Sequence, residues 1–171
     1  MIRLVTLFFL ISGSVISQQT TPKAAFLEKW NNSKEYLLEM AAQMPEDKYK
    51  FKPTERQMSF KDQLLHIHKN MHWLGTTYFS KEPIDKDKSA ENLPETKKEI
   101  IKLLKTTFDK VYTQVQNTNK DEFSSEVDFF AGRKTKLQIL NLLQDHVTHH
   151  RGQLIVYLNL NVIEPPRYVG W

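Results

Sequence analysis

The sequence predicts an all-α protein, a four-helix bundle with long connections between its helices. Four segments of the 171-residue chain repeat apolar residues every three or four positions, which is the period of an amphipathic helix. None of them shows the sustained alternation of apolar and polar residues that a half-buried strand requires. Five glycines and seven prolines are too few for a chain of many tight turns. Because four amphipathic helices bury their apolar faces best against one another, a bundle follows.

The first two predicted helices have clear start signals. Thr21 is followed by Pro22, which suits an N-cap with proline at the first helical position, and Pro45 ends this helix. Ser59 starts the second helix, and Asp62 three residues later resembles the other half of a capping box. The two apolar stripes are Phe26, Trp30, Ser33, Leu37, Ala41 and Met44, and then Phe60, Leu64, Ile67, Met71, Leu74 and Tyr78.

The last two helices are marked in the same way. The third is expected to begin near residues 92–94, and the fourth at Thr135, where Gln138 completes a capping box. Their stripes are Ile100, Leu104, Phe108, Val111 and Val115, and then Leu140, Leu143, Val147, Leu154 and Leu158.

The connections leave the direction of each helix open. They cover about 46–58, 80–92 and 117–134, which is long enough for crossovers from one end of a bundle to the other. The last connection contains Phe129 and Phe130. We expect this apolar loop to form a small satellite core or to pack over one end of the bundle.

The N-terminus is predicted to be a secretory signal peptide spanning residues 1–17. Arg3 is a minimal basic region, and the apolar run over residues 4–11 is shorter than the roughly 20 residues that span a bilayer. Small residues then lead to a cleavage site before Gln18. Residues 18–171 are expected to form one exported domain, periplasmic or secreted and free of the membrane after cleavage. An uncleaved N-terminal anchor is the alternative.

Composition narrows the function. The chain has no cysteine, so no disulfide can stabilise it and no protein thiol can act as nucleophile or metal ligand. The 24 lysines and arginines and 20 aspartates and glutamates are mixed along the chain, without the basic block typical of nucleic-acid binding. Bundles of this size commonly form homodimers, but no residue in the sequence demonstrates one.

Three of the six histidines fall within five residues of the predicted fourth helix. Stepping about 100° per residue from Leu140, His150 lies at about 280° and His146 at about 240°, at the edge of the apolar stripe. His149 lies at about 180°, away from it. His146 and His150 are four residues apart, so their Cβ atoms would be about 5–6 Å from each other. Two imidazoles at this spacing can bind one metal ion.

A third ligand would have to come from another helix, because catalytic metal sites usually use three protein ligands and keep one position open. The second helix contains His66, His68 and His72. Measured from its stripe, the angles of about 240°, 80° and 120° mildly favour His68, although the wide apolar arc of this helix leaves the choice open. A hydrogen-bonded boundary residue is the alternative for any single histidine. The sequence lacks His-Glu-x-x-His, so a zincin protease is not supported.

Two motifs resemble the DinB/YfiT-like family of metalloenzymes. Residues 59–67, Ser-Phe-Lys-Asp-Gln-Leu-Leu-His-Ile, resemble the second-helix motif of that family. Residues 146–154, His-Val-Thr-His-His-Arg-Gly-Gln-Leu, with Pro165 and Pro166 downstream, resemble its last-helix motif. Residues 49–53, Tyr-Lys-Phe-Lys-Pro, also fit, and the likeness covers essentially the whole mature chain.

The resemblance implies a four-helix bundle that holds one divalent metal ion on three histidines. Carried over by position, these are His66 from the second helix and His146 and His150 from the last. The motif thus selects His66 where the angles favour His68, which stays the fallback ligand. Three imidazoles and an open position suit Zn²⁺, Ni²⁺ or Fe²⁺.

Three further side chains are candidates to orient the ligand histidines. Gln153 at about 220° and Tyr157 at about 260° continue the column of His146 and His150. Asp62 lies four residues before His66, although a charge at the N-terminus of a helix is the competing interpretation of Asp62.

Some relatives within this family are thiol-dependent transferases. A bound metal would polarise a substrate oxygen or lower the pKa of a bound water or thiol. The resemblance therefore implies a metal-dependent hydrolase or thiol transferase acting on a small molecule. The thiol would be a substrate, since the chain has none, and export makes hydrolysis at least as plausible. No catalytic residue is identified, and the alternative function is a non-catalytic metal-binding or partner-binding bundle of the cell envelope.

Overall fold

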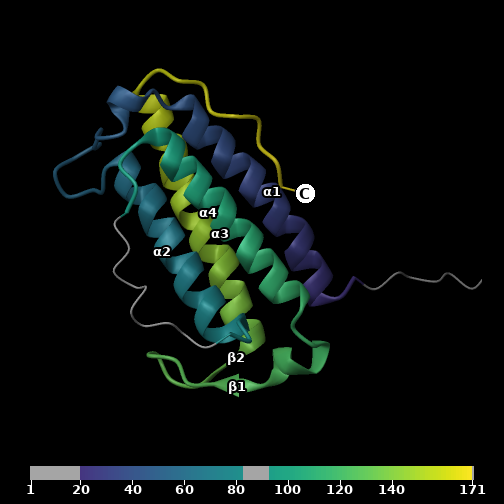
Figure 1. Cartoon of the computed structure of the whole chain (residues 1–171). Coiled ribbons are helices and arrows are strands. Elements are labelled where there is room, and N and C mark those ends of the chain that lie inside the picture. The colour runs from purple at the N-terminus through teal and green to yellow at the C-terminus, as the bar shows by residue number, and fades with distance from the viewer. Residues whose placement is uncertain (1–19, 83–92, 171) are drawn as a thin grey trace, which may run out of the picture.

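Four long helices dominate the computed structural model, which describes residues 20–82 and 93–170 (Figure 1). They are α1 (Pro22–Gln43), α2 (Phe60–Phe79), α3 (Lys97–Gln116) and α4 (Lys136–Leu160). Two short 3-10 helices, η1 (Glu46–Lys48) and η3 (Lys120–Ser124), lie in the connections. A hairpin that the sequence did not predict pairs β1 (Glu126–Val127) with β2 (Lys134–Thr135) in antiparallel fashion. The predicted all-α four-helix bundle is confirmed.

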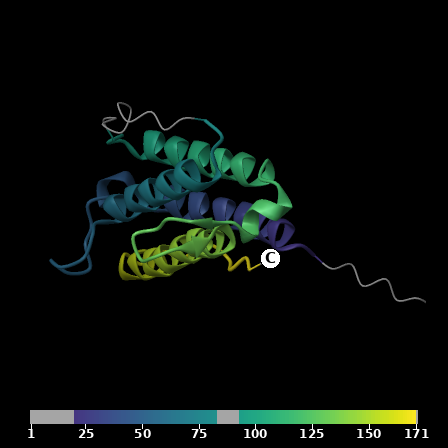
Figure 2. The same cartoon turned by 90° about the horizontal axis from the view of Figure 1, so that it is seen from below.

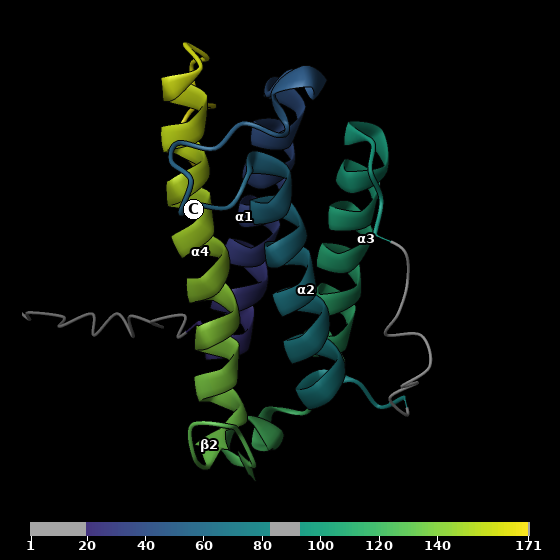
Figure 3. The same ribbon diagram turned by 90° about the vertical axis from the view of Figure 1, so that its left-hand side faces the viewer.

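The helices run up, down, down and up, an order that the sequence left open. Figures 1 and 3 show α1 and α4 running in one direction and α2 and α3 in the other. Both α3 and α4 pack against α1 and α2, and Figure 2 shows α3 and α4 on opposite sides of the bundle. As a result α2 and α4 are antiparallel neighbours, which is the arrangement that builds the histidine site described below.

Helix starts follow the predicted caps, with one exception. The side chains of Thr21, Ser59 and Thr135 each accept a hydrogen bond from a backbone N–H in the first turn of their helix. The expected start of the third helix near residues 92–94 was wrong, because Thr96 is the N-cap and forms a full capping box with Glu99. The hydroxyl and carboxylate of this pair satisfy helix N–H groups that a start at proline would leave without side-chain partners.

The core contains large buried aromatic side chains, and at one point two of its helices approach each other closely. Trp30 is completely buried, stacks on Phe26 at 5.1 Å between ring centroids, and donates its indole N–H to the carbonyl of Phe108 over 3.1 Å. Where α2 meets α3, a methyl group added at Gly75 would lie 2.8 Å from Val111 Cγ2. This position needs glycine because the neighbouring helix leaves no room for a side chain.

The apolar loop of the last connection forms the expected small cluster at one end of the bundle. Phe129 and Phe130 lie 5.9 and 6.2 Å from the ring of Trp73 on α2, and the Tyr78 hydroxyl donates to the Asp128 carbonyl. Figure 1 shows the hairpin lying across the ends of α2 and α4. Phe130 remains 83% exposed, so the loop covers this end only in part.

The predicted signal peptide, residues 1–17, lies outside the described residues and stays a prediction. Across residues 20–82 and 93–170, no helix is both long enough and apolar enough to cross a bilayer.

Candidate metal centre

Three histidines from two helices meet between α2 and α4. They are His66 from α2 and His146 and His150 from α4, and one ring nitrogen of each lies within 4.8 Å of the others. The Nε2 atoms of His66 and His146 are 3.1 Å apart. The ring centroids of the three pairs are separated by 4.4 to 4.9 Å. In the described part of the chain this is the one such group of histidine and carboxylate side chains.

The α4 pair is placed as its position on the helix predicts. His146 and His150 are one turn apart and face α2, with His150 only 8% exposed. His149 is exposed; it touches His150 edge-on and does not join the group. The spacing of four residues therefore brings together two rings that the triple-histidine run alone does not distinguish.

The angular preference for His68 on α2 was wrong about which histidine faces α4. His68 faces α3, where its Nδ1 lies 2.8 Å from the hydroxyl of Thr107. The ring of His72 is stacked near that of His68, 6.0 Å away, and is also outside the group. The physical reason is that α2 packs against α3 and α4 on two different sides, so its buried arc has no single centre that a helical wheel could locate.

A glutamine that the sequence reasoning missed holds His150 in place. Gln63 is 5% exposed, and its Oε1 lies 2.6 Å from His150 Nδ1, while Gln153 Oε1 lies 3.1 Å from the same nitrogen. An amide oxygen can only accept a hydrogen bond, so Nδ1 carries the proton and Nε2 keeps its lone pair for a ligand. The available signal was the position of Gln63, a polar side chain on a buried helix face one turn before His66.

The three predicted orienting residues have different surroundings. Gln153 contacts His150 directly and accepts from Gln63 Nε2 over 2.8 Å. Tyr157 donates to the carbonyl of Met58 over 2.6 Å and lies 3.4 Å from Gln63 Nε2, so it supports Gln63 and not a histidine. Asp62 contacts Ser59 at the start of α2.

The carboxylate of Asp62 caps α2. It accepts hydrogen bonds from the hydroxyl of Ser59 at 2.7 Å and from the backbone N–H of Ser59 at 3.4 Å. This contact completes the capping box. Asp62 is therefore a charge at the N-terminus of the helix, which was the competing interpretation.

Burial keeps the histidines neutral at ordinary pH. Burial, followed by the neighbouring His150, His66 and His149, lowers the pKa of His146 to about 4. Burial also lowers the pKa of His150 to about 4, with His66 as the next cause. The pKa of His66 is lowered by burial and then by the charge of Lys69. Three neutral imidazoles offer lone pairs to a metal without first releasing protons.

The geometry and the donor set fit a divalent transition metal. Nitrogens about 2.1 Å from a tetrahedral zinc ion stand about 3.4 Å apart, close to the 3.1 Å between the Nε2 atoms of His66 and His146. The third nitrogen, within 4.8 Å, is set somewhat wider. His146 Nδ1 is buried without a hydrogen-bond partner, so the protein alone does not satisfy this ring.

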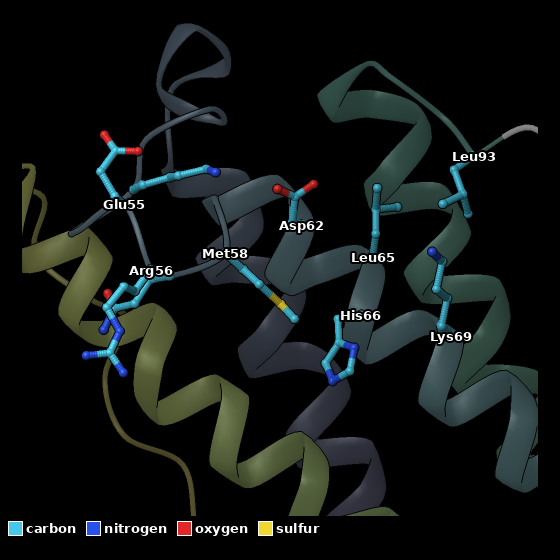
Figure 4. A pocket seen from close by; sticks show the side chains of 10 residues that line it. Glu55, Arg56, Met58, Asp62, Leu65, His66, Lys69 and Leu93 are labelled. Carbon is cyan, nitrogen blue, oxygen red and sulfur yellow. The ribbon is translucent and has the colours of Figure 1, made fainter.

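A cavity of about 460 Å³ opens beside the group (Figure 4). His66 is the one member of the group that lines it, and the rest of the lining is Lys52, Glu55, Arg56, Gln57, Met58, Asp62, Leu65, Lys69 and Leu93. A volume of this size is typical of small-molecule sites.

The protein is therefore a four-helix bundle with three histidines brought together from its second and last helices. The model of the DinB family matches residues 17–167. The chain belongs to the DinB family, as the motifs of the second and last helices implied.

Several relatives share the sequence or the fold. The protein named uncharacterized protein YjoA, from Bacillus subtilis strain 168, is 28% identical over 123 residues, covering 70% of this chain and 78% of YjoA. The crystal structure of this DinB-like protein superposes with a TM-score of 0.72 at 22% identity, covering 86% of this chain and 99% of that one. A DinB-like protein from Bacillus cereus has a TM-score of 0.68 at 18% identity, covering 84% and 95%. These structural likenesses establish the fold.

Proposed function

We propose that the protein binds one divalent metal ion through His66, His146 and His150 and uses it to act on a small molecule. The observation that carries the proposal is the convergence of the three rings, with nitrogens within 4.8 Å of one another. The tautomer of His150, which is held by Gln63 over 2.6 Å, adds to it because it leaves Nε2 free to face the group.

A bound metal would act as a Lewis acid toward a substrate oxygen or thiol. The chain's own contribution is to hold three uncharged ligands at fixed positions and to leave one side open. The open side is the one at His66, because His66 lines the cavity of about 460 Å³. The cavity favours an enzyme, a metal-dependent hydrolase or thiol transferase, over a metal-binding bundle without turnover.

Elemental analysis of the purified protein tests metal binding directly. We expect one equivalent of zinc, nickel or iron in the wild type and its loss in His66→Ala, His146→Ala and His150→Ala. The matched control is His149→Ala, which removes a neighbouring exposed histidine and should retain the metal. Retention in His66→Ala would exclude His66 as a ligand, and a wild type without stoichiometric metal would overturn the proposal.

Turnover separates the enzyme from the non-catalytic alternative. The metal-loaded wild type and His66→Ala would be assayed with chromogenic esters and phosphoesters, and with a low-molecular-weight thiol and a chromogenic electrophile. Activity that requires His66 supports an enzyme, and its class of substrate distinguishes hydrolysis from thiol transfer. A metal-loaded protein inactive toward both sets would favour the metal-holding bundle.

A further inference from the structure

We propose that the cavity beside His66 binds a small molecule with an anionic head group, a carboxylate or phosphate, carried on a short apolar body. This inference rests on the proposed function, since it assigns the substrate class of the same site. The cavity is formed by the connection before α2, the first turns of α2 and Leu93. It reaches the histidine group through His66 alone and does not include the α4 pair, so a ligand would approach from this side.

Among the described residues, no carboxylate forms an ion pair with the cations of the cavity. Lys52, Arg56 and Lys69 all line it, and none of them forms an ion pair with a described residue. Lys34 on α1, by contrast, is paired with Asp109 over 3.1 Å. Cations that line a cavity without partners favour an anionic ligand.

The two carboxylates in the lining, Glu55 and Asp62, offset only two of its three positive charges. Asp62 is held by the hydroxyl and backbone N–H of Ser59 in the capping box. Figure 4 shows the carboxylate of Glu55 directed away from His66. Three neutral imidazoles would also leave the two positive charges of a bound metal uncompensated, which adds to the attraction for an anion.

The apolar side chains of the lining account for the apolar body of the proposed ligand. Met58, Leu65 and Leu93 line the same cavity, and Figure 4 shows the side chain of Met58 directed toward His66. Met58 is 42% exposed, and its flexible thioether can pack against apolar groups of varied shape. The volume of about 460 Å³ equals roughly 15 water molecules at about 30 Å³ each, which suits a small molecule and not a polymer.

Isothermal titration of the zinc-loaded protein tests the substrate class. The probes are hexanoate and hexyl phosphate as anions, with hexanol and hexylammonium as neutral and cationic molecules of matched length. The variants are Lys69→Gln and Arg56→Gln, with Lys98→Gln as the control. Lys98 is exposed on α3 and does not line the cavity, so the control makes the same change of charge elsewhere. Zinc content is measured first in each protein.

We expect at least one anion to bind at least tenfold more tightly than hexanol. Lys69→Gln and Arg56→Gln should each weaken that anion about three- to tenfold while zinc content stays constant. The stronger of the two anions identifies the head group. Equal binding of hexanol, or equal effects of Lys69→Gln and Lys98→Gln, would overturn the proposal. Loss of zinc from the wild type would instead overturn the proposed metal site, and the same titration on metal-free protein would still show whether the cations select anions.

Discussion

The contact between Gln63 and His150 links the buried core of the bundle to the candidate metal ligands. Gln63 Oε1 lies 2.6 Å from His150 Nδ1, and Gln63 Nε2 donates to Gln153 over 2.8 Å. Replacing Gln63 by leucine removes both contacts and places an apolar side chain of similar size in a position that is 5% exposed. The perturbation therefore acts on the orientation and tautomer of His150 more than on packing.

The contacts of His150 determine how large a loss of metal affinity we expect. Loss of a group that orients a metal-ligating histidine typically lowers metal affinity about 10- to 100-fold, which is about 1.4 to 2.7 kcal/mol. Gln153 Oε1 lies 3.1 Å from the same His150 Nδ1, so one acceptor remains after Gln63 is changed. We therefore expect about a tenfold loss in Gln63→Leu and about 100-fold when Gln153→Leu is added.

The assay is competition for zinc against a colorimetric chelator at pH 7, with thermal unfolding measured in parallel. Gln63→Glu is the rescue variant, because its carboxylate still accepts from His150 Nδ1, and it should bind zinc at least as tightly as the wild type. A folded Gln63→Leu protein with zinc affinity within about twofold of the wild type would refute the assignment of Gln63 as the group that positions His150.

Other predictions follow from the titration of the site, from packing and from the N-terminus. Metal-free protein should lose stability as pH falls from 6.5 toward about 4, because the pKa values of His146 and His150 are lowered from 6.5 to about 4 and the unfolded chain takes up protons first. Urea unfolding between pH 7 and 4.5 checks this, and a level profile would contradict it. Gly75→Ala should destabilise the fold by about 1–3 kcal/mol, since the new methyl meets two α3 side chains at 2.8 Å. Gly152→Ala is the helical control with nothing within 4 Å and should stabilise by up to about 1 kcal/mol, both measured by chemical denaturation. Sequencing of the mature, exported protein should begin at Gln18, and retention of Met1 would contradict cleavage.

The features of the fold that lie within one helix could be predicted from the sequence. Thr21, Ser59 and Thr135 cap their helices as predicted, because capping depends on residues within one turn. The pairing of His146 with His150 also follows from spacing alone, since residues four apart share a face of any α-helix. The start of α3 was predicted too early because Thr96 and Glu99 make a stronger cap than the proline before them.

The features that depend on which helices are neighbours could not be predicted, because they follow from the packing of the whole bundle. The antiparallel packing of α2 against α4 places His66, and not His68, beside the α4 pair. The same packing brings Gln63 to His150 across 87 residues of sequence. A helical wheel shows which residues share a face, but the direction of each face is set by packing on several sides at once. For α2, which contacts both α3 and α4, that direction is a property of the assembled bundle.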